Sequence, residues 1–377
     1  MRIAIFCHSI VSDWNHGNAH FLRGVARELL ARGHDLRIFE PCDGWSRRNL
    51  IARHGEQPLE EFRRAFPELR STLYDLESLD VDAALDGVGL AIVHEWNDPR
   101  LVRRIGLARV RSQELRVLFH DTHHRSVTKP RDMGRYDLRH YDGVLAYGEV
   151  IRQLYLERAW TERAWTWHEA ADVRLFKPLL GRDRAGDLVW IGNWGDGERT
   201  TELSEFLLEP ARTLGLTGSV FGVRYPRSAR RAIAAAGLPY RGWVANHRVP
   251  EVFARHAVTV HIPRRPYVDA LPGIPTIRPF EALACGIPLV CSRWDDVEGL
   301  FTPGEDFLVA RDGQEMQALL GRVLRDRDLA RHLAQHGRRT ILERHTCSHR
   351  VDELLAIAAE LGVGTETDET LAAGTVS

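Results

Sequence analysis

The sequence has few cysteines, and their spacing fits neither a metal site nor a disulfide framework. Five occur among the 377 residues, at Cys7, Cys42, Cys285, Cys291 and Cys347, and no two of them form a C-x-x-C pair. Cys7 and Cys291 lie in apolar, strand-like runs, where a thiol is usually a reduced core residue. We therefore expect neither a disulfide-stapled secreted domain nor a zinc domain.

Long apolar runs and an excess of charge are also absent. No apolar run approaches the roughly 20 residues that a membrane-spanning helix needs, and residues 1–7 have the pattern of a short strand rather than of a signal peptide. The 51 basic and 52 acidic residues give a formal net charge of −1, which offers no general attraction to nucleic acid or anionic lipid. We expect a soluble, cytoplasmic protein with no nucleic-acid partner and no transmembrane segment.

The length of the chain predicts two domains, each able to bury its own core. Near the start, residues 3–7 and 35–40 have strand patterns, and the helix between them ends at Gly33. In such a βαβ unit the polar loop 8–18 lies at the carboxyl end of a parallel strand, where open sheets bind ligands. A nicotinamide fingerprint G-x-G-x-x-G is missing, because only Gly17 and Gly24 are present.

Polar side chains cluster directly after the apolar strand predicted at 115–119. His120, Asp121, His123 and His124 stand within five residues, and burying them without partners would cost desolvation energy. The histidines lack the i, i+4 pairing of a helical zinc site. A histidine suits proton transfer near neutral pH, so the cluster indicates catalysis, with a strand-end cap as the alternative for His120. Residues 46–80, before the next strand at 89–93, are predicted to be a polar helical region on the surface.

In the second half, three predicted strands are each followed by arginine. The strand at 187–191 leads into a glycine-rich loop that begins at Gly192 and ends at Arg199; Arg224 follows the strand at 219–223, and Arg264 and Arg265 follow the strand at 257–262. Parallel strands direct such residues toward one rim, where glycines allow close approach of a ligand and arginines neutralise a diphosphate. We favour Arg199 and Arg265 for that role.

Residues 272–291 read as loop, helix, turn and strand, with Gly286 ending the helix. A helix that begins from a Gly/Pro loop leaves unpaired backbone N–H groups and a positive dipole end, which form a site for phosphate. One turn further along, Glu281 could accept hydrogen bonds from ribose hydroxyls. A solvated helix glutamate is the alternative for this residue.

This segment resembles the donor-site helix of the group 1 (GT4-like) nucleotide-sugar glycosyltransferases of GT-B fold, and more closely their bacterial-type, spore-maturation (CgeB-like) subgroup. The family has two glutamates separated by seven residues, the first contacting the sugar and the second the ribose. Glu281 matches the second, whereas the first falls at Gly273, so the sugar-contacting carboxylate is absent. The resemblance assigns donor binding to a set that also includes Ile274, Thr276 and Arg278.

The resemblance implies an α/β protein with two Rossmann-like domains whose parallel sheets face a central cleft. The expected boundaries are an acceptor domain at 1–178, a donor domain at 179–345, a helix at 346–361 that crosses back to the first domain, and a flexible tail at 362–377. Within the first domain, the resemblance places three residues in the cleft near the acceptor: Gly17, Asn18 and His20. For His20 an N-terminal helix position facing water is the alternative. In the family, a histidine after the strand corresponding to 115–119 reaches the donor sugar and the acceptor. The resemblance assigns this role to His120, with Asp121 orienting it or acting as the base.

The function that follows from the resemblance is transfer of a hexose-type sugar from a nucleoside-diphosphate donor to an acceptor hydroxyl, with retention of configuration. No Asp-x-Asp motif follows a strand, so we expect no metal and no cofactor, and the helix dipole and arginines would neutralise the donor. Two alternatives are a nucleotide-sugar epimerase or hydrolase of the same architecture, and a non-catalytic nucleotide-sugar binding protein. The base, the sugar and the acceptor, whether a glycan, a lipid-linked acceptor or a small molecule, are left open, as is the oligomeric state.

Overall fold

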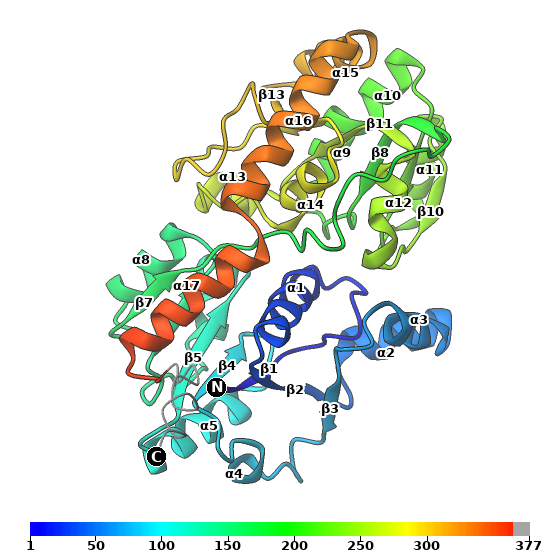
Figure 1. Cartoon of the computed structure of the whole chain (residues 1–377). Coiled ribbons are helices and arrows are strands. Elements are labelled where there is room, and N and C mark those ends of the chain that lie inside the picture. Colours follow the sequence, from blue (N-terminus) through cyan, green and yellow to red (C-terminus); the bar gives the residue numbers. More distant parts are fainter. Residues whose placement is uncertain (365–377) are drawn as a thin grey trace, which may run out of the picture.

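The computed structural model describes residues 1–364 and divides them between two α/β units (Figure 1). Each unit is built on a sheet whose strands are all parallel. This confirms the predicted fold class of two parallel α/β domains. Most of the tail predicted at 362–377 lies outside the described residues.

The first sheet has seven strands in the order β3-β2-β1-β4-β5-β6-β7. Its central strands are buried on both faces, which explains their nearly continuous apolar sequences. The strands are β1 (Arg2–Phe6), β2 (Asp35–Pro41), β3 (Ser71–Tyr74), β4 (Leu90–His94), β5 (Arg116–Asp121), β6 (Gly143–Ala146) and β7 (Ala164–Thr166).

Helices cover both faces of this sheet. On one face, α1 and α17 pack together with the apolar side chains of β1 and β4, and α4, α5 and α8 cover the opposite face. The helices of this unit are α1 (Asn18–Ala31), α2 (Trp45–His54), α3 (Gln57–Ala65), α4 (Val81–Ala84), α5 (Pro99–Arg111), α6 (Arg125–Thr128), α7 (Pro130–Met133), α8 (Glu149–Glu157) and, from the end of the chain, α17 (Cys347–Glu360).

The prediction of a purely helical region at 46–80 was wrong. It contains α2 and α3, but Ser71–Tyr74 forms the edge strand β3, which pairs with β2. Only Tyr74 of this strand is buried. An edge strand of four residues with one buried side chain lacks the alternating apolar pattern that identifies longer strands, and its pairing partner is distant in sequence.

The second sheet has six strands in the order β10-β9-β8-β11-β12-β13. They are β8 (Gly186–Ile191), β9 (Gly218–Phe221), β10 (Tyr240–Gly242), β11 (His256–His261), β12 (Leu289–Ser292) and β13 (Leu308–Ala310). One face packs against the helical stretch 200–214, α11 and α15, and the other against α12, α14 and α16.

The sequence predicts helices at 200–214, about 313–325 and 328–344, and the helices of the second unit agree closely with these ranges. The first of these is continuous but contains one π-helical turn, Ser204–Leu208, between α9 and α10. The full set is α9 (Thr200–Leu203), α10 (Glu209–Leu214), α11 (Arg227–Ala235), the 3-10 turn Asn246–Arg248, α12 (Val249–Phe253), α13 (Arg265–Ala270), α14 (Ile277–Cys285), α15 (Gly313–Arg325) and α16 (Arg327–Arg344).

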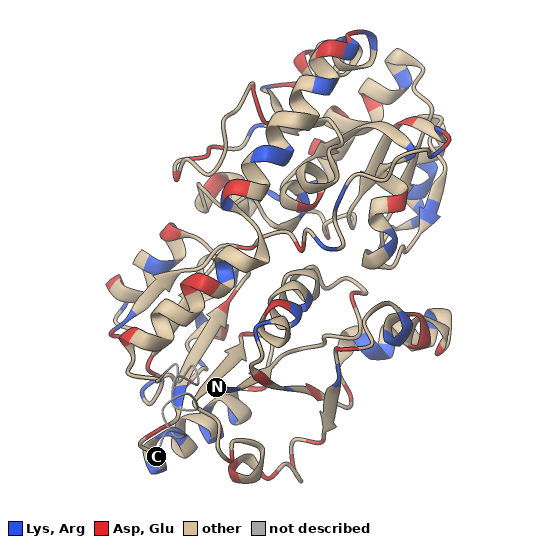
Figure 2. Cartoon of the chain, viewed as in Figure 1, with Lys and Arg blue, Asp and Glu red and all other residues tan. Residues whose placement is uncertain are grey.

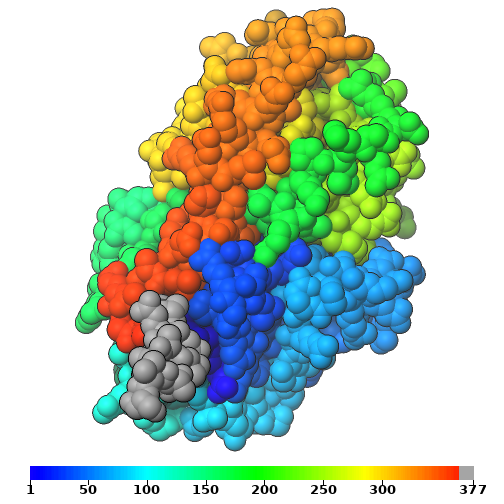
Figure 3. All heavy atoms as spheres, in the orientation of Figure 1, coloured from blue at the N-terminus to red at the C-terminus, as the bar shows by residue number. Residues whose placement is uncertain are grey.

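The chain passes between the two units twice, and the two connections lie side by side. After β7 it crosses to β8, and after α16 it returns into α17, which lies against α1 (Figure 3). Ala171 and Thr346 bridge the two connections in parallel, with the N–H of Ala171 donating to His345 O at 3.0 Å and that of Cys347 to Ala171 O at 3.0 Å.

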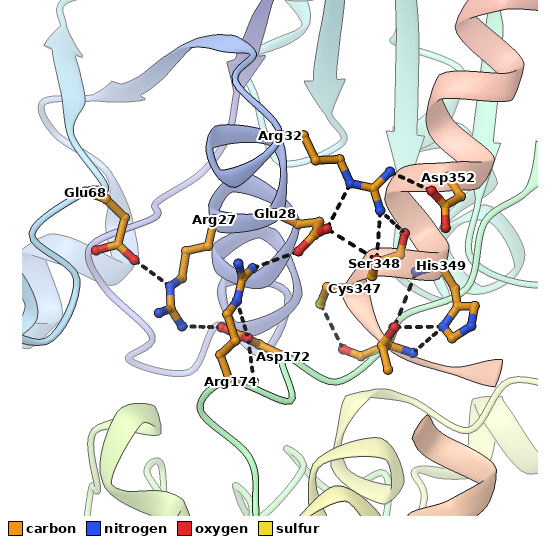
Figure 4. A network of polar contacts seen from close by, with 12 residues as sticks. Arg27, Glu28, Arg32, Glu68, Asp172, Arg174, Cys347, Ser348, His349 and Asp352 are labelled. Carbon is orange, nitrogen blue, oxygen red and sulfur yellow. Dashed lines mark hydrogen bonds and ion pairs between the residues drawn. The ribbon is translucent and has the colours of Figure 1, made fainter. Parts of the chain in front are cut away.

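Polar contacts at the meeting of α1, α17 and the crossing segment reinforce this packing (Figure 4). Arg32, directly after α1, donates to Glu28 at 2.8 Å, to Ser348 Oγ at 2.7 Å and to Asp352 at 2.5 Å, and Arg27 of α1 donates to Asp172 at 2.6 Å. Elsewhere, charged residues of both signs are interspersed along the chain in both units (Figure 2), consistent with the near-zero net charge.

Candidate active site

A cavity of about 720 Å³ lies between the two units, where the turns at the carboxyl ends of both sheets meet. The first unit contributes the loop after β1 and the turns after β4, β5 and β6. The second contributes the turns after β8, β9, β10 and β11 and the start of α14. The volume falls in the range of small-molecule sites, roughly 300–1,000 Å³.

The loop after β1 is held in place by Arg23. This buried residue donates hydrogen bonds to two backbone carbonyls of the loop and to Asp13 Oδ2, the last at 2.8 Å. Asp13 also accepts from Trp243 Nε1 and from the N–H of Asn246, both at 3.0 Å and both from the second unit. Burial alone would raise the pKa of Asp13, but the charges of Arg23 and His20 outweigh it and the pKa is lowered.

Gly17, Asn18 and His20, which were predicted to line the cleft, all line the cavity. They form the N-terminal turn of α1, directly after the loop that Arg23 fixes. His20 is 9% exposed, so it does not face open water as the alternative held. Its Nδ1 atom lies 2.9 Å from Glu281 Oε1 on α14, which places it between the two units.

His120 and Asp121, the predicted catalytic pair, lie behind the cavity wall. His120 is fully buried between Phe21 and Trp167, and burial lowers its pKa to about 3. Within residues 1–364, neither of its ring nitrogens has a hydrogen-bond partner. Asp121 accepts from the Tyr155 hydroxyl at 2.9 Å, and burial together with the charge of Glu95 raises its pKa well above the usual value.

The next histidines of the same cluster do line the cavity. The N–H of His123 donates to Asp121 Oδ1 at 3.1 Å, so the buried carboxyl positions the turn that presents His123 and His124. His124 Nε2 lies 3.6 Å from Glu198 Oε2 of the second unit. Burial lowers the pKa of His124 to about 4, so its ring is neutral at pH 7 and can accept a hydrogen bond.

Two arginines of the second unit meet in the cavity wall. Arg199 donates to Ile262 O and Asn193 O, each at 2.8 Å, and Arg264 donates to Glu198 Oε2 at 2.9 Å and Asn193 Oδ1 at 3.1 Å. Burial and then the charge of Arg264 lower the pKa of Arg199 to about 9. Arg199 therefore remains cationic at pH 7, and an anion bound between it and Arg264 would offset the repulsion between the two guanidinium groups.

The other two arginines that follow strands differ in position. Arg224 lines the cavity from a backbone with φ +61° and forms an ion pair with Asp196 at 3.0 Å. Arg265, favoured from the sequence, does not line the cavity. Its side chain is 49% exposed, and its guanidinium donates to the backbone oxygens of Gly197 and Glu198. The neighbouring Arg264 occupies the position in the cavity wall that was expected for Arg265.

The start of α14 reaches the cavity through Thr276, Ile277 and Arg278. Thr276 directly precedes the helix, and its φ of +57° marks a sharp change of backbone direction between the preceding loop and α14. Gly192, at the end of β8, also lines the cavity. Ile274 is fully buried away from it and packs near Gly148 of the first unit.

Glu281 is fully buried one turn into α14. Its carboxylate accepts from Asn246 Nδ2 at 2.8 Å and from Arg278, and it contacts His20 as described above. Burial alone would raise its pKa, but Arg278 and His20 outweigh burial and lower it. In this conformation the ionised carboxylate therefore holds three residues of the cavity wall.

Sequence reasoning missed several residues of the cavity. Asp13 and Asn246 connect the two units, and Glu169 lines the cavity from the segment after β7. Arg264 was named from the sequence but was not favoured. Glu169 is a polar residue just past the carboxyl end of a parallel strand, but β7 is three residues long and has too little sequence pattern to be predicted as a strand.

A second cavity, of about 420 Å³, lies beside the turn after β10. Trp243 and Val244 belong to both cavities, and Arg241, Arg248 and Arg255 line the second. Among residues 1–364, no cluster of three or more histidine, cysteine or acidic side chains is placed to hold a metal ion. No helix in this part of the chain has the length and apolarity needed to cross a membrane.

Comparison with known proteins identifies the class of the fold. Residues 199–356 match a family model described as glycosyl transferase-like, which spans most of the second unit and α17. The sequence has no significant match among curated proteins. Solved glycosyltransferases share the architecture along nearly the whole chain, so the fold is that of the GT-B glycosyltransferases.

Three of these structures show the extent of the likeness. An α-glucosyltransferase in complex with UDP and DNA has a TM-score of 0.68 at 14% identity, with 95% of this chain and 99% of that chain covered. Anabaena HepE in complex with UDP and glucose has a TM-score of 0.66 at 13% identity, with 95% of this chain and 99% of that chain covered. Sucrose-phosphate synthase from Thermosynechococcus elongatus has a TM-score of 0.64 at 15% identity, with 96% of this chain and 99% of that chain covered.

Proposed function

We propose that this protein is a glycosyltransferase that moves a sugar from a nucleoside diphosphate to an acceptor hydroxyl. The observation that carries the proposal is the convergence of Arg199, Arg264, Arg278 and the N-terminus of α14 on one cavity between two parallel sheets. Three guanidinium groups and a helix N-terminus form a site for a diphosphate. The glycosyl transferase-like match of residues 199–356, which contain all four features, supports this reading.

The donor would lie along the second unit, with its diphosphate beside Arg199 and Arg264. An anion there offsets the repulsion between the two guanidinium groups, so binding is favoured without a metal ion. Metal independence is therefore part of the proposal. Because two of the solved structures described above contain UDP, we place UDP first among the nucleotides to test.

The proposed role of Glu281 is to bind the ribose after a small opening of the two units. One of its three partners, His20, comes from the first unit, whereas Arg278 and Asn246 come from the second. Separation of the units would withdraw His20 and free one carboxylate lone pair for a ribose hydroxyl. The other two hydrogen bonds would keep Glu281 ionised and in position.

The acceptor would enter beside the first unit, near His123 and His124. In the reaction the acceptor oxygen bonds to the anomeric carbon, the bond from that carbon to the diphosphate breaks, and the hydroxyl proton passes to a base or to the released diphosphate. His120 and Asp121 take part in this proposal through the turn that they support, since Asp121 holds the backbone of His123. Retention of configuration and the CgeB-like assignment remain part of the proposal.

An assay of nucleoside diphosphate release tests the function. The protein is incubated with UDP-glucose, GDP-mannose or ADP-glucose, with and without a mixture of simple glycoside acceptors, and once more with EDTA. We expect release that depends on the acceptor and persists in EDTA, with the anomeric configuration of the product read by NMR. Release without any acceptor would indicate a hydrolase, and tight binding without turnover would indicate a binding protein.

A further inference from the structure

The position where the resembling family has its first glutamate has no room for a side chain. Gly273 adopts φ +88°, and a Cβ atom built there would lie 2.8 Å from Glu298 Oε1 and 2.9 Å from its Cγ atom. Real Cβ contacts are essentially never that short, so Glu298 would have to move. The carboxylate that the family supplies from this position is therefore absent from the sequence, and Glu298 occupies the space beside Gly273.

Glu298 is itself held firmly at the boundary of the two units. Its Oε1 atom accepts from the N–H of Glu149, at the start of α8, at 3.0 Å, and its Oε2 atom lies 2.9 Å from His168 Nε2. The other ring nitrogen of His168 lies 3.0 Å from Tyr147 O. The same side chain that fills the space at Gly273 therefore fixes the first-unit segment that contains His168.

The residue after His168 is a carboxyl group in the cavity wall. Glu169 is 7% exposed and lines the cavity together with Tyr147, Tyr267 and Asn18. No ion pair to Glu169 is present among the described residues, whereas most other buried carboxylates of the cavity region have an arginine or histidine partner. A buried, unpaired carboxyl group beside polar ring hydroxyls is costly for folding, which points to a role in binding.

We propose that Glu169 binds the hydroxyls of the donor sugar and thereby replaces, from the first unit, the carboxylate that is absent at Gly273. This inference rests on the proposed function and names the residue that would recognise the sugar moiety. Glu281, on α14, would then bind the ribose of the donor, and Glu169, on the opposite wall of the cavity, would bind the sugar.

The charge state of Glu169 suits this role. Burial and the nearby charge of Glu281 raise its pKa to about 8, partly opposed by Asn18 and Arg278. Tyr147 and Tyr267, which also face it, have pKa values raised by burial and stay neutral. At pH 7 Glu169 is therefore a neutral acid that both donates and accepts hydrogen bonds and does not repel the diphosphate. Above pH 8 it ionises, and sugar nucleotide binding should weaken.

The test compares a nucleotide with its sugar derivative. Dissociation constants for UDP and UDP-glucose, followed by the GDP and ADP pairs, are measured by calorimetry for wild type, Glu169→Ala and Glu169→Gln at pH 7 and pH 9. We expect Glu169→Ala to weaken binding of the sugar nucleotide at least tenfold while binding of the nucleotide changes less than about twofold. Glu169→Gln resembles the neutral acid, so its dissociation constant for the sugar nucleotide should stay close to that of wild type at pH 7. At pH 9 this variant should not show the weaker binding that is expected of wild type.

Glu162→Gln is the matched control, because Glu162 is an exposed carboxylate just before β7, and it should leave both constants unchanged. Melting temperatures of all variants show whether each one folds. If Glu169→Ala changes the dissociation constants for the nucleotide and the sugar nucleotide equally, or changes neither, the inference is wrong while the proposed function stands. If wild type binds no nucleotide of the panel, the proposed function fails and this inference fails with it.

Discussion

At the scale of single residues, the cavity is defined by which of two neighbouring side chains turns inward. His123 and His124 line it while His120 and Asp121 lie behind them, and Arg264 lines it while Arg265 faces outward. Sequence spacing places such residues at the end of a strand, but it does not show which of two neighbouring residues faces the cavity. The direction of each side chain depends on how the following turn packs, which involves segments far apart in the chain.

The arginine pair gives a prediction with a built-in control. Arg264→Gln should weaken binding of a nucleoside diphosphate at least tenfold, because it removes one of the cationic groups expected to face the phosphates. Arg265→Gln makes the same chemical change one residue later, on a half-exposed side chain outside the cavity, and should weaken binding by no more than about twofold. Titration calorimetry measures both constants. Equal losses in the two variants would contradict the placement of the diphosphate beside Arg264.

At the scale of elements, most helices and central strands could be predicted from the sequence. The apolar periodicity of 313–325 and the glycine stop at Gly286 identified α15 and the end of α14 correctly. The short edge strand β3 and the strand β7 were missed, because three or four residues carry too little pattern. The return of the last helix to the first unit was expected only from the family resemblance, and its contact with α1 was not predicted, since no local signal specifies a contact between segments more than 300 residues apart.

The contact between α1, α17 and the crossing segment depends on Gly24. A Cβ atom there would lie 2.3 Å from Cys347 Sγ and 2.9 Å from Asp172 Cβ. Gly24→Ala should therefore lower the free energy of unfolding by about 1–3 kcal/mol through overpacking. Thermal and urea unfolding measure the loss.

Gly134→Ala is the control for this prediction. Gly134 has φ −64°, and its nearest contact for an added Cβ is 3.5 Å, which is ordinary van der Waals spacing. The substitution should be neutral or slightly stabilising, because alanine reduces the entropy of the unfolded chain. A loss at Gly134 as large as that at Gly24 would show that the close packing of α1 and α17 is not the cause.

At the scale of the whole molecule, the two units meet through polar side chains that also surround the cavity. Asp13 accepts hydrogen bonds from Trp243 and Asn246, His20 contacts Glu281, and Glu298 contacts His168. Apolar contacts accompany them, because Tyr267 and Ile274 pack with the core of the first unit and Val223 packs with Trp14. Opening of the units therefore exposes groups that can bond to water or to a ligand, as ribose binding by Glu281 requires.

Asp13→Asn tests this interface and has a defined pH dependence. The lowered pKa of Asp13 means that its ionised form is favoured by folding; its contribution is present at pH 7 and is lost as the pH falls below about 4. Because the substitution leaves Arg23 without its buried partner, we expect a loss on the order of 3 kcal/mol at pH 7. The difference in melting temperature from wild type should shrink as the pH is lowered toward 3. A constant difference across this range would contradict the ionic role.

Binding of a nucleoside diphosphate between the two units can be seen in a crystal structure of the protein with UDP. We expect phosphate oxygens bonded to Arg199 and Arg264 and facing the N-terminus of α14, with a ribose hydroxyl on Glu281 in place of His20. A nucleotide found in the second cavity, among Arg241, Arg248 and Arg255, or a main cavity left empty at saturating UDP, GDP and ADP, would contradict it.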